Sequence, residues 1–304
     1  MTPDILCLGE PMLEFNQQVD GNYLPGHGGD TSNCAVAAAR QGAAVGYVTH
    51  VGADPFGQSF MDLWQAEGID TSTVKQVTDA PTGVYFVTHG ADGHQFSYFR
   101  AGSAASRMTA DDLPCKALCS ANILHVSGIS QAISDSATDA VFAAIDLVRD
   151  AGGQVSYDTN LRLKLWPLDR ARAITHAAMA RCTIALPGLE DATQLTGLTA
   201  PDAIADFYLG LGAEVVALTL GHEGTLVATH QDRQRIKGRE VEAVDATAAG
   251  DTFDGAFLAR LVAGDTAFDA ARYANAAAAL STQGYGAVAP MPRKDAVEAF
   301  LRQG

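Results

Sequence analysis

Apolar residues in this chain occur in short runs that alternate with longer amphipathic stretches. The first run, residues 5–8, is wholly apolar and stops at Gly9, as expected for a buried strand. From about residue 120 the alternation of apolar runs and amphipathic stretches becomes regular, which predicts an α/β fold with a mostly parallel sheet covered by helices on both faces. The predicted strands are 5–8, 44–51, 83–88, 95–100, 123–126, 155–157, 183–186 and 215–220. The predicted helices are 34–41, 54–67, 136–149, 170–180, 201–211, 271–280 and 296–301, with a short one near Glu190 and another after Gly250.

Two segments, about 11–27 and 82–100, do not follow this alternation. Pro and Gly interrupt the first segment, and its polar and apolar residues are mixed as in an exposed sheet. The second contains two strand-like runs separated by Asp92-Gly93, a strong hairpin signal. We expect the two segments to pair into one small sheet that projects from a single unit spanning residues 1–304.

Composition narrows the classes of partner. The chain has 304 residues, a net charge of −15 and an isoelectric point near 4.7. Such an acidic protein is a poor partner for nucleic acid or an anionic membrane, and an anionic substrate would have to be attracted by local Arg or Lys. Five cysteines, mostly in apolar runs, favour the reducing cytoplasm. No apolar run has the length of a signal peptide or a membrane span.

Residues 244–257 contain the strongest chemical signal. Three small residues, 248–250, precede a helix whose apolar stripe includes Phe253 and Phe257. Bare backbone amides at a helix N-terminus form an anion site. Asp251 places a carboxylate beside that site, where it serves either as an ordinary helix cap or as a base that takes a proton from an attacking hydroxyl.

This stretch resembles the C-terminal signature of the ribokinase-like (PfkB) carbohydrate kinases, which usually reads Asp-Thr-Thr-Gly-Ala-Gly-Asp. Here Ala246 and Ala248 replace a Thr and a Gly. The resemblance extends from Gly9 to about Gly286 and implies a ribokinase-like, Rossmann-type sandwich in which the small sheet is a lid over the sugar. It also implies ATP and Mg²⁺ as cofactors, with Asp251 as the catalytic base. In this reading the amides of Ala248, Ala249 and Gly250 form the anion hole.

Other matches imply further binding residues. The N-terminal Gly-Gly signature of the family, which binds sugar hydroxyls, corresponds to Gly28, Gly29, Asp30 and Asn33. The nucleotide-binding turn corresponds to Thr219, Gly221 and Gly224, and Asn275 matches a position near the adenine. Without the resemblance, both turns would be read as ordinary tight turns and Asn275 as a polar cap on an Ala-rich helix.

The segment 158–162 follows a buried strand and carries Asp, Asn and Arg together, which favours a site over solvated surface. The resemblance gives Asn160 and Arg162 contact with phosphate or substrate. The family's Asn-x-x-Glu motif, which orders magnesium, is altered: Gly188 replaces the Asn, and either Asp191 or Glu190 takes the acidic position. Asp245 and Thr247 are candidates for a monovalent-cation (K⁺) site.

Residues 97–106 and 126–129 resemble the 2-keto-3-deoxygluconate kinases within the family. That substrate is a sugar acid, and Arg binds carboxylates with a two-pronged fork. Arg100 and Arg162 are therefore candidates for its carboxylate, and Tyr85, Tyr98 and Ile129 for the rest of the sugar. The structural alternatives are surface ion pairs for the arginines and packing in the lid for the tyrosines.

Two rival functions remain open. The first is a kinase of the same fold that acts on a neutral sugar, such as fructose or ribose, or on a nucleoside. The second is a non-catalytic sugar or nucleotide sensor, against which an intact Asp251 argues. No Gly-x-Gly-x-x-Gly follows the first strand and no Gly-Lys dipeptide occurs, so a dinucleotide-dependent dehydrogenase and a P-loop enzyme are disfavoured. A homo-oligomer is compatible with the sequence, which does not fix the number of subunits.

Overall fold

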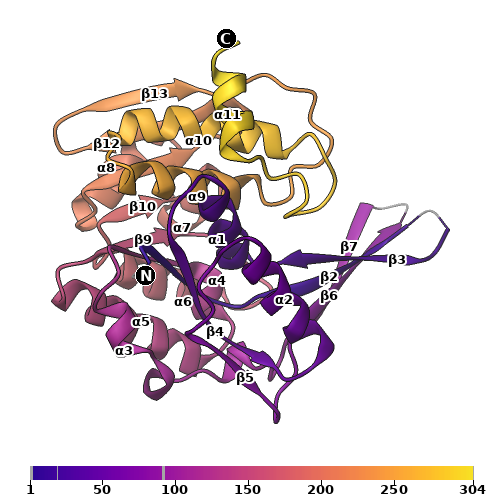
Figure 1. Cartoon of the computed structure of the whole chain (residues 1–304). Helices are drawn as coiled ribbons and strands as arrows, with labels where there is room; N and C mark the ends of the chain where they lie inside the picture. Colours follow the sequence, from indigo (N-terminus) through magenta and orange to yellow (C-terminus); the bar gives the residue numbers. More distant parts are fainter. Residues whose placement is uncertain (1–2, 19, 91–92, 304) are drawn as a thin grey trace.

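The computed structural model describes residues 3–18, 20–90 and 93–303, which form a large sheet between helices and a smaller sheet that projects from it (Figure 1). The large sheet has the strand order β13-β12-β11-β10-β9-β8-β1-β4-β5. Adjacent strands in this sheet run parallel, except for the antiparallel pairs β11–β12 and β12–β13. Its strands are β1 (Ile5–Leu8), β4 (Val45–Gly52), β5 (Val74–Val77), β8 (Ile123–Ser127), β9 (Gln154–Asp158), β10 (Ile184–Leu186), β11 (Val215–Thr219), β12 (Gly224–Thr229) and β13 (Arg233–Lys237).

Helices cover both faces of this sheet, and alternate side chains of each strand enter two separate cores. Ile5 and Cys7 of β1 belong to one core, whereas Leu6 and Leu8 belong to the other. The first core is closed by α1 (Asp30–Arg40), α2 (Pro55–Ala66), α9 (Ala249–Val262), α10 (Ala267–Ser281) and α11 (Lys294–Leu301). The second is closed mainly by α3 (Cys115–Leu118), α5 (Asp135–Asp150), α6 (Leu168–Met179), α7 (Leu189–Thr196) and α8 (Pro201–Leu211). The predicted α/β sandwich is therefore confirmed.

The remaining elements are short. They are α4 (Gly128–Ala132) and the 3₁₀ turns η1 (Ala105–Arg107), η2 (Ala110–Asp112) and η3 (Gly221–Glu223). None of the helices in the described part of the chain combines the length and apolarity that a membrane span requires.

The small sheet joins the two irregular segments in the order β3-β2-β6-β7, as the sequence pattern predicted. Its strands are β2 (Met12–Gln17), β3 (Tyr23–Gly28), β6 (Gly83–Gly90) and β7 (Gly93–Phe99). The register pairs Glu14 with Tyr85 and Tyr85 with Tyr98, so these three side chains share one face. Asp92 of the predicted hairpin turn lies outside the described residues.

Helix α1 begins at Asp30, four residues earlier than its apolar pattern predicted. Gly29 precedes it with φ = 95°, and a Cβ at Gly29 would overlap the carbonyl oxygen of Glu10. The extra turn places Asp30 and Asn33 three residues apart on one face of the helix. The pattern also missed β5, β12 and β13, short strands near the sheet edges whose sequences are largely mixed or polar.

Candidate active site

A cavity of about 2120 Å³ is lined by residues of both sheets. The large sheet contributes the carboxyl ends of β9, β10 and β11 to this lining, and α1 and α9 contribute their N-termini. The small sheet contributes one face of β2, β6 and β7. This is where ligands of open α/β sheets bind. The predicted site residues that line it are Gly29, Asp30, Asn33, Tyr85, Tyr98, Arg100, Ile129, Asn160, Arg162, Asp191, Thr219, Asp245, Thr247, Ala248, Ala249, Gly250 and Asp251. Gly28, Gly221, Gly224 and Asn275 are not among its lining residues.

The N-terminus of α9 lies open toward this cavity. Its N-cap, Ala248, has the left-handed conformation (φ 58°, ψ 19°) and no side chain that could accept from the first turn. The amide of Ala249 donates to the Ala246 carbonyl at 3.2 Å, whereas those of Ala248 and Gly250 have no acceptor in the described part of the chain. Of the three amides that the sequence analysis predicted to bind an anion, those of Ala248 and Gly250 are therefore free to donate to a bound anion.

Asp251 lies in the first turn of α9 and is partly buried. Its Oδ2 accepts a hydrogen bond from Asn33 Nδ2 at 2.8 Å. Burial, followed by the negative charge of Asp30, raises the pKa of Asp251 to about 7, although the Asn33 hydrogen bond and the Arg162 charge oppose this shift. A carboxylate that titrates near neutral pH is suited to act as a general base.

Close packing of α9 on α1 places Asp251 beside Asn33. A Cβ at Gly255, on the second turn of α9, would overlap the Cys34 carbonyl oxygen and lie 2.6 Å from the Ala37 Cβ. Glycine is therefore required for the two backbones to approach this closely.

Further acids surround Asp251. Asp254 is one turn along α9 and buried, and burial with the nearby Asp158 raises its pKa. Burial, and then the charge of Asp251, likewise raises the pKa of Asp158. The sequence analysis gave Asp254 no role, although the three-residue spacing from Asp251 on a predicted helix was a usable signal.

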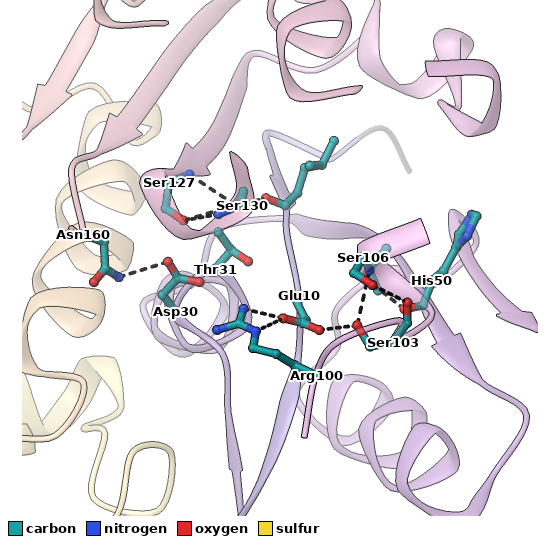
Figure 2. A network of polar contacts seen from close by, with 12 residues as sticks. Glu10, Asp30, Thr31, His50, Arg100, Ser103, Ser106, Ser127, Ser130 and Asn160 are labelled. Atoms are coloured by element: carbon teal, nitrogen blue, oxygen red, sulfur yellow. Dashed lines mark hydrogen bonds and ion pairs between the residues drawn. The ribbon is translucent and has the colours of Figure 1, made fainter. Parts of the chain in front are cut away.

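Asp30 and Asn160 connect α1 to the loop after β9. Asn160 Nδ2 donates to Asp30 Oδ2 at 2.9 Å (Figure 2). Asp30 Oδ1 and Asn33 Oδ1 are buried and have no hydrogen-bond partner in the described residues. Unsatisfied buried acceptors are costly, so these two oxygens are suited to receive ligand hydroxyl groups.

The two candidate arginines differ in how their charge is balanced. Arg100 Nε donates to Glu10 Oε2 at 2.8 Å, and its Nη2 contacts the same oxygen (Figure 2). Arg162 is exposed, donates to the Leu161 carbonyl at 2.9 Å, and has no ion pair with a carboxylate among the described residues. The guanidinium of Arg162 is therefore not paired directly with a carboxylate, whereas that of Arg100 is.

Tyr85 and Tyr98 pack against each other on the face of the small sheet that lines the cavity, with ring centroids 5.8 Å apart. Tyr85 Oη donates to Glu14 Oε2 at 2.6 Å, and burial together with that carboxylate raises the tyrosine pKa. The sequence analysis missed Glu14. Its alternation with Met12 and Asn16 in β2 marks the same face, but the pattern gave no hint of its partner.

Two predicted nucleotide residues have structural roles outside the cavity. Asn275 accepts from Thr225 Oγ1 at 2.7 Å and donates to the Ile236 carbonyl at 3.2 Å, which fastens α10 to β12 and β13. A Cβ at Gly224 would overlap the same Ile236 oxygen. Their contact with a nucleotide stays a prediction.

Between the two candidate acids, Asp191 lines the cavity and Glu190 is exposed outside its lining. Asp191 Oδ2 accepts from the Leu161 amide at 2.8 Å, so Oδ1 remains for a magnesium-bound water, in keeping with the oxygen ligands that Mg²⁺ prefers. Asp245 accepts from the amides of Thr247 at 2.9 Å and Gly286 at 3.0 Å. Among the described residues, no three His, Cys, Asp or Glu side chains come together as a metal-binding group.

Comparison with known proteins gives consistent results. Residues 3–294 match the sequence profile of the pfkB family carbohydrate kinases. The chain is 33% identical to the 2-dehydro-3-deoxygluconokinase of Bacillus subtilis (strain 168), over 99% of this chain and 96% of the relative. It is 29% identical to probable fructokinase-4 of Arabidopsis thaliana, over 98% and 96%. The crystal structure of Vibrio cholerae O395 fructokinase with fructose, ADP and calcium superposes with a TM-score of 0.89 at 30% identity, covering 99% of this chain and 100% of that one.

Proposed function

This chain belongs to the pfkB family of carbohydrate kinases, and we propose that its sugar is 2-keto-3-deoxygluconate, also called 2-dehydro-3-deoxygluconate. The products would be ADP and the 6-phospho sugar acid. Membership of a kinase family implies ATP and a divalent metal ion as cofactors. The similarity to 2-dehydro-3-deoxygluconokinase over nearly the full chain supports this substrate.

The observation that carries the proposal is the position of Asp251 beside the open amides of α9, at the junction of the two sheets. Asp251 would take the proton from the attacking hydroxyl group of the sugar. The oxygen of that hydroxyl would then bond to the γ-phosphorus of ATP, while the bond between the γ-phosphorus and the leaving oxygen of ADP breaks. The amides of Ala248 and Gly250 would hold the charge on the transferred group. Mg²⁺ would neutralise charge on the triphosphate, and we propose that Asp191, which lines the cavity, orders it.

Two features favour a sugar acid. Arg162 supplies a positive charge at the cavity, without a direct ion pair among the described residues, in a chain whose net charge is −15. Arg100 follows β7 and lines the cavity, and Glu10 does not engage its Nη1. A carboxylate near both guanidinium groups would form charge-assisted hydrogen bonds.

A neutral ketose such as fructose is the second candidate, and one observation favours it. Glu10 compensates Arg100, and Glu14 adds a negative charge to the same face, so the sugar end of the cavity is not strongly cationic. Fructokinases among the similar proteins point the same way.

A coupled ADP-release assay with a substrate panel tests the proposal. The panel contains 2-keto-3-deoxygluconate, its C4 epimer, fructose, ribose and a nucleoside, each with Mg²⁺ and with or without K⁺. We expect kcat/KM for 2-keto-3-deoxygluconate to exceed that for fructose by at least about 30-fold, the low end of the effect of a desolvated charge pair. A higher kcat/KM for fructose would reject the sugar-acid proposal, and an absence of ATP turnover on the whole panel would favour a sensor.

Three expectations accompany this proposal without a direct test in the structure. They are K⁺ binding near Asp245 and Thr247, assembly as a homo-oligomer, and a cytoplasmic location. Comparing the assay with and without K⁺ addresses the first, and the mass of the particle in solution addresses the second.

A further inference from the structure

In the described part of the chain, the four connections between the large and the small sheet meet around one residue, Glu10. It lies between β1 and β2, and its side chain is 0% exposed. The connection from β3 to α1 passes at Gly29, packed against the Glu10 carbonyl oxygen. The connection into β6 passes at Gly83, where a Cβ would lie 3.0 Å from Glu10 Oε1. The connection out of β7 passes through Arg100 and Ser103.

The two carboxylate oxygens of Glu10 hold different parts of this last connection. Oε2 accepts from Nε and Nη2 of Arg100, and Oε1 accepts from Ser103 Oγ (Figure 2). Ser103 is buried, and its amide donates to the Arg100 carbonyl at 3.0 Å. The next amide, Ala104, donates to the Pro81 carbonyl at 2.8 Å. The carboxylate thus ties the segment after β7 to the connection between β1 and β2, and the backbone bond from Ala104 ties the same segment to the residues before β6.

We propose that Glu10 is a positioning residue: it fixes the Arg100 guanidinium, and with it the base of the small sheet, in the orientation that binds the sugar. This inference rests on the proposed role of Arg100 at the sugar. Because Nε and Nη2 are engaged, the Nη1 side of the guanidinium remains for the ligand. Removing one partner of a buried ion pair leaves the other charge uncompensated, so Glu10 restricts where the Arg100 guanidinium can lie.

The molecule contains a matched control for the loss of a buried Arg–Glu pair. Arg40 and Glu67 form an ion pair at 2.7 Å with side chains 11% and 7% exposed, compared with 11% and 0% for Arg100 and Glu10. Arg40 also donates to the Val288 and Met291 carbonyls, so this pair joins α1 to the end of α2 and a C-terminal loop. Neither Arg40 nor Glu67 lines the cavity.

The test is a double-mutant cycle on whichever panel sugar has the highest turnover. Glu10→Ala should lower kcat/KM for the sugar by roughly 100-fold, as expected when a binding group is misplaced by about 1 Å, and leave the KM for ATP within about twofold. Glu10→Gln should lose less, since it keeps an acceptor for Arg100. In an Arg100→Ala background, Glu10→Ala should cause no further loss, because Glu10 acts through Arg100. Glu67→Gln should lower the melting temperature without changing either KM.

Additive losses in the cycle, or an unchanged KM for the sugar in Glu10→Ala, would overturn the proposal. If Glu10→Ala does not fold, Ser103→Ala leaves the Arg100–Glu10 pair in place, removes the hydrogen bond to Oε1 and a longer one from the Ser106 amide at 3.3 Å, and should still raise the KM for the sugar severalfold. Failure of the sugar-acid assignment is distinguishable, because the substrate panel reveals it with the wild-type enzyme, whereas the cycle measures the coupling between Glu10 and Arg100.

A second measurement needs no substrate. Amide hydrogen exchange in β7 should be faster in Glu10→Gln than in wild type and unchanged in Glu67→Gln. Equal exchange in wild type and Glu10→Gln would also overturn the proposal, even if no sugar on the panel is phosphorylated.

Discussion

The two sheets contribute to the cavity in different ways. Every residue of β1 and β4 in the large sheet is buried, and helices cover both of its faces. The small sheet has a helix near one end of one face, and its side chains Leu24 and Phe99 are 59% and 63% exposed. Rigid, covered elements hold reacting groups more accurately than exposed ones do. We therefore expect changes on the large-sheet side to affect turnover, and changes on the small sheet to affect the KM for the sugar.

The largest effect is expected at Asp251. Asp251→Asn keeps the size of the side chain and removes the base, so turnover should fall by about 10²–10⁴-fold. The KM for the sugar should change much less, as measured by steady-state kinetics with circular dichroism as the control for folding. Near-normal turnover in a folded variant would remove Asp251 from the chemistry and break the division between the sheets.

A substitution at Gly250 should also lower turnover, because it would block the approach of the transferred phosphoryl group to the amides of α9. A Cβ at Gly250 would contact nothing within 4 Å, so Gly250→Val should fold. Its side chain would occupy the space in front of the open amides, and turnover should fall by at least about 100-fold, the scale of losing one anion-hole donor. Full activity together with an unchanged melting temperature would show that the phosphoryl group binds elsewhere.

Arg100 tests the small-sheet side of the cavity, and Arg162 provides the comparison on the large-sheet side. Arg100→Ala should raise the KM for the sugar acid by about 30-fold or more and leave the KM for ATP nearly unchanged. Arg162→Ala, on the large-sheet side, should disturb both. Arg100→Lys should rescue only in part, because an ammonium cannot donate to Glu10 and the sugar as a planar guanidinium does. If Arg100→Ala weakens the acid and fructose equally, Arg100 acts through the structure of the small sheet and not through the carboxylate.

The pH profile sharpens the picture of the large-sheet side. Because the pKa of Asp251 is raised to about 7, kcat/KM should fall about tenfold per pH unit below that value. The folded protein binds this proton more tightly than the unfolded chain, so stability contributed by Asp251 is lost as pH rises from about 4 to about 7. The melting temperature of Asp251→Asn relative to wild type should increase over the same window. If the difference in melting temperature between Asp251→Asn and wild type stays constant with pH, the pKa of Asp251 is not raised.

The smallest effect concerns the strained cap of α9. Ala248 has φ = 58°, a conformation that costs a non-glycine residue about 1–2 kcal/mol, whereas glycine adds about 0.4–1 kcal/mol of unfolded-state entropy. Ala248→Gly should therefore raise the free energy of unfolding by up to about 1 kcal/mol in urea titration. Ala249→Gly, at the first position of the helix, is the control and should lower it, by less than the about 0.5–1 kcal/mol that glycine costs in a helix interior. Destabilisation by Ala248→Gly would mean that the wild-type cap is not strained.

Most of the fold was predictable from local patterns. The apolar runs located β1, β4, β8 and β11 to within about one residue, and the same alternation predicted a parallel sheet between two helical layers. The start of α1 was wrong by one turn, because it depends on the contact between Gly29 and the Glu10 backbone rather than on apolar spacing.

The candidate site was predictable only where its residues are neighbours in sequence. Residues 248–251 form one turn, so their chemistry could be read directly. The sequence also suggested Arg100 as a ligand of the sugar carboxylate, but it could not reveal the compensation of Arg100 by Glu10, 90 positions away.

The sequence by itself determined the order of strands and helices, the small-residue turn before Asp251 and the polar residues after β9, because periodicity and local propensity act within a few residues. The tertiary structure alone decided the contacts between Asn33 and Asp251, between Asp30 and Asn160, and between Glu10 and Arg100. These pairs are 218, 130 and 90 residues apart, and each forms because helix packing and sheet pairing bring distant segments together. The pKa of Asp251 and the balance of charge around Arg100 depend on those contacts, since burial and neighbouring charges set both.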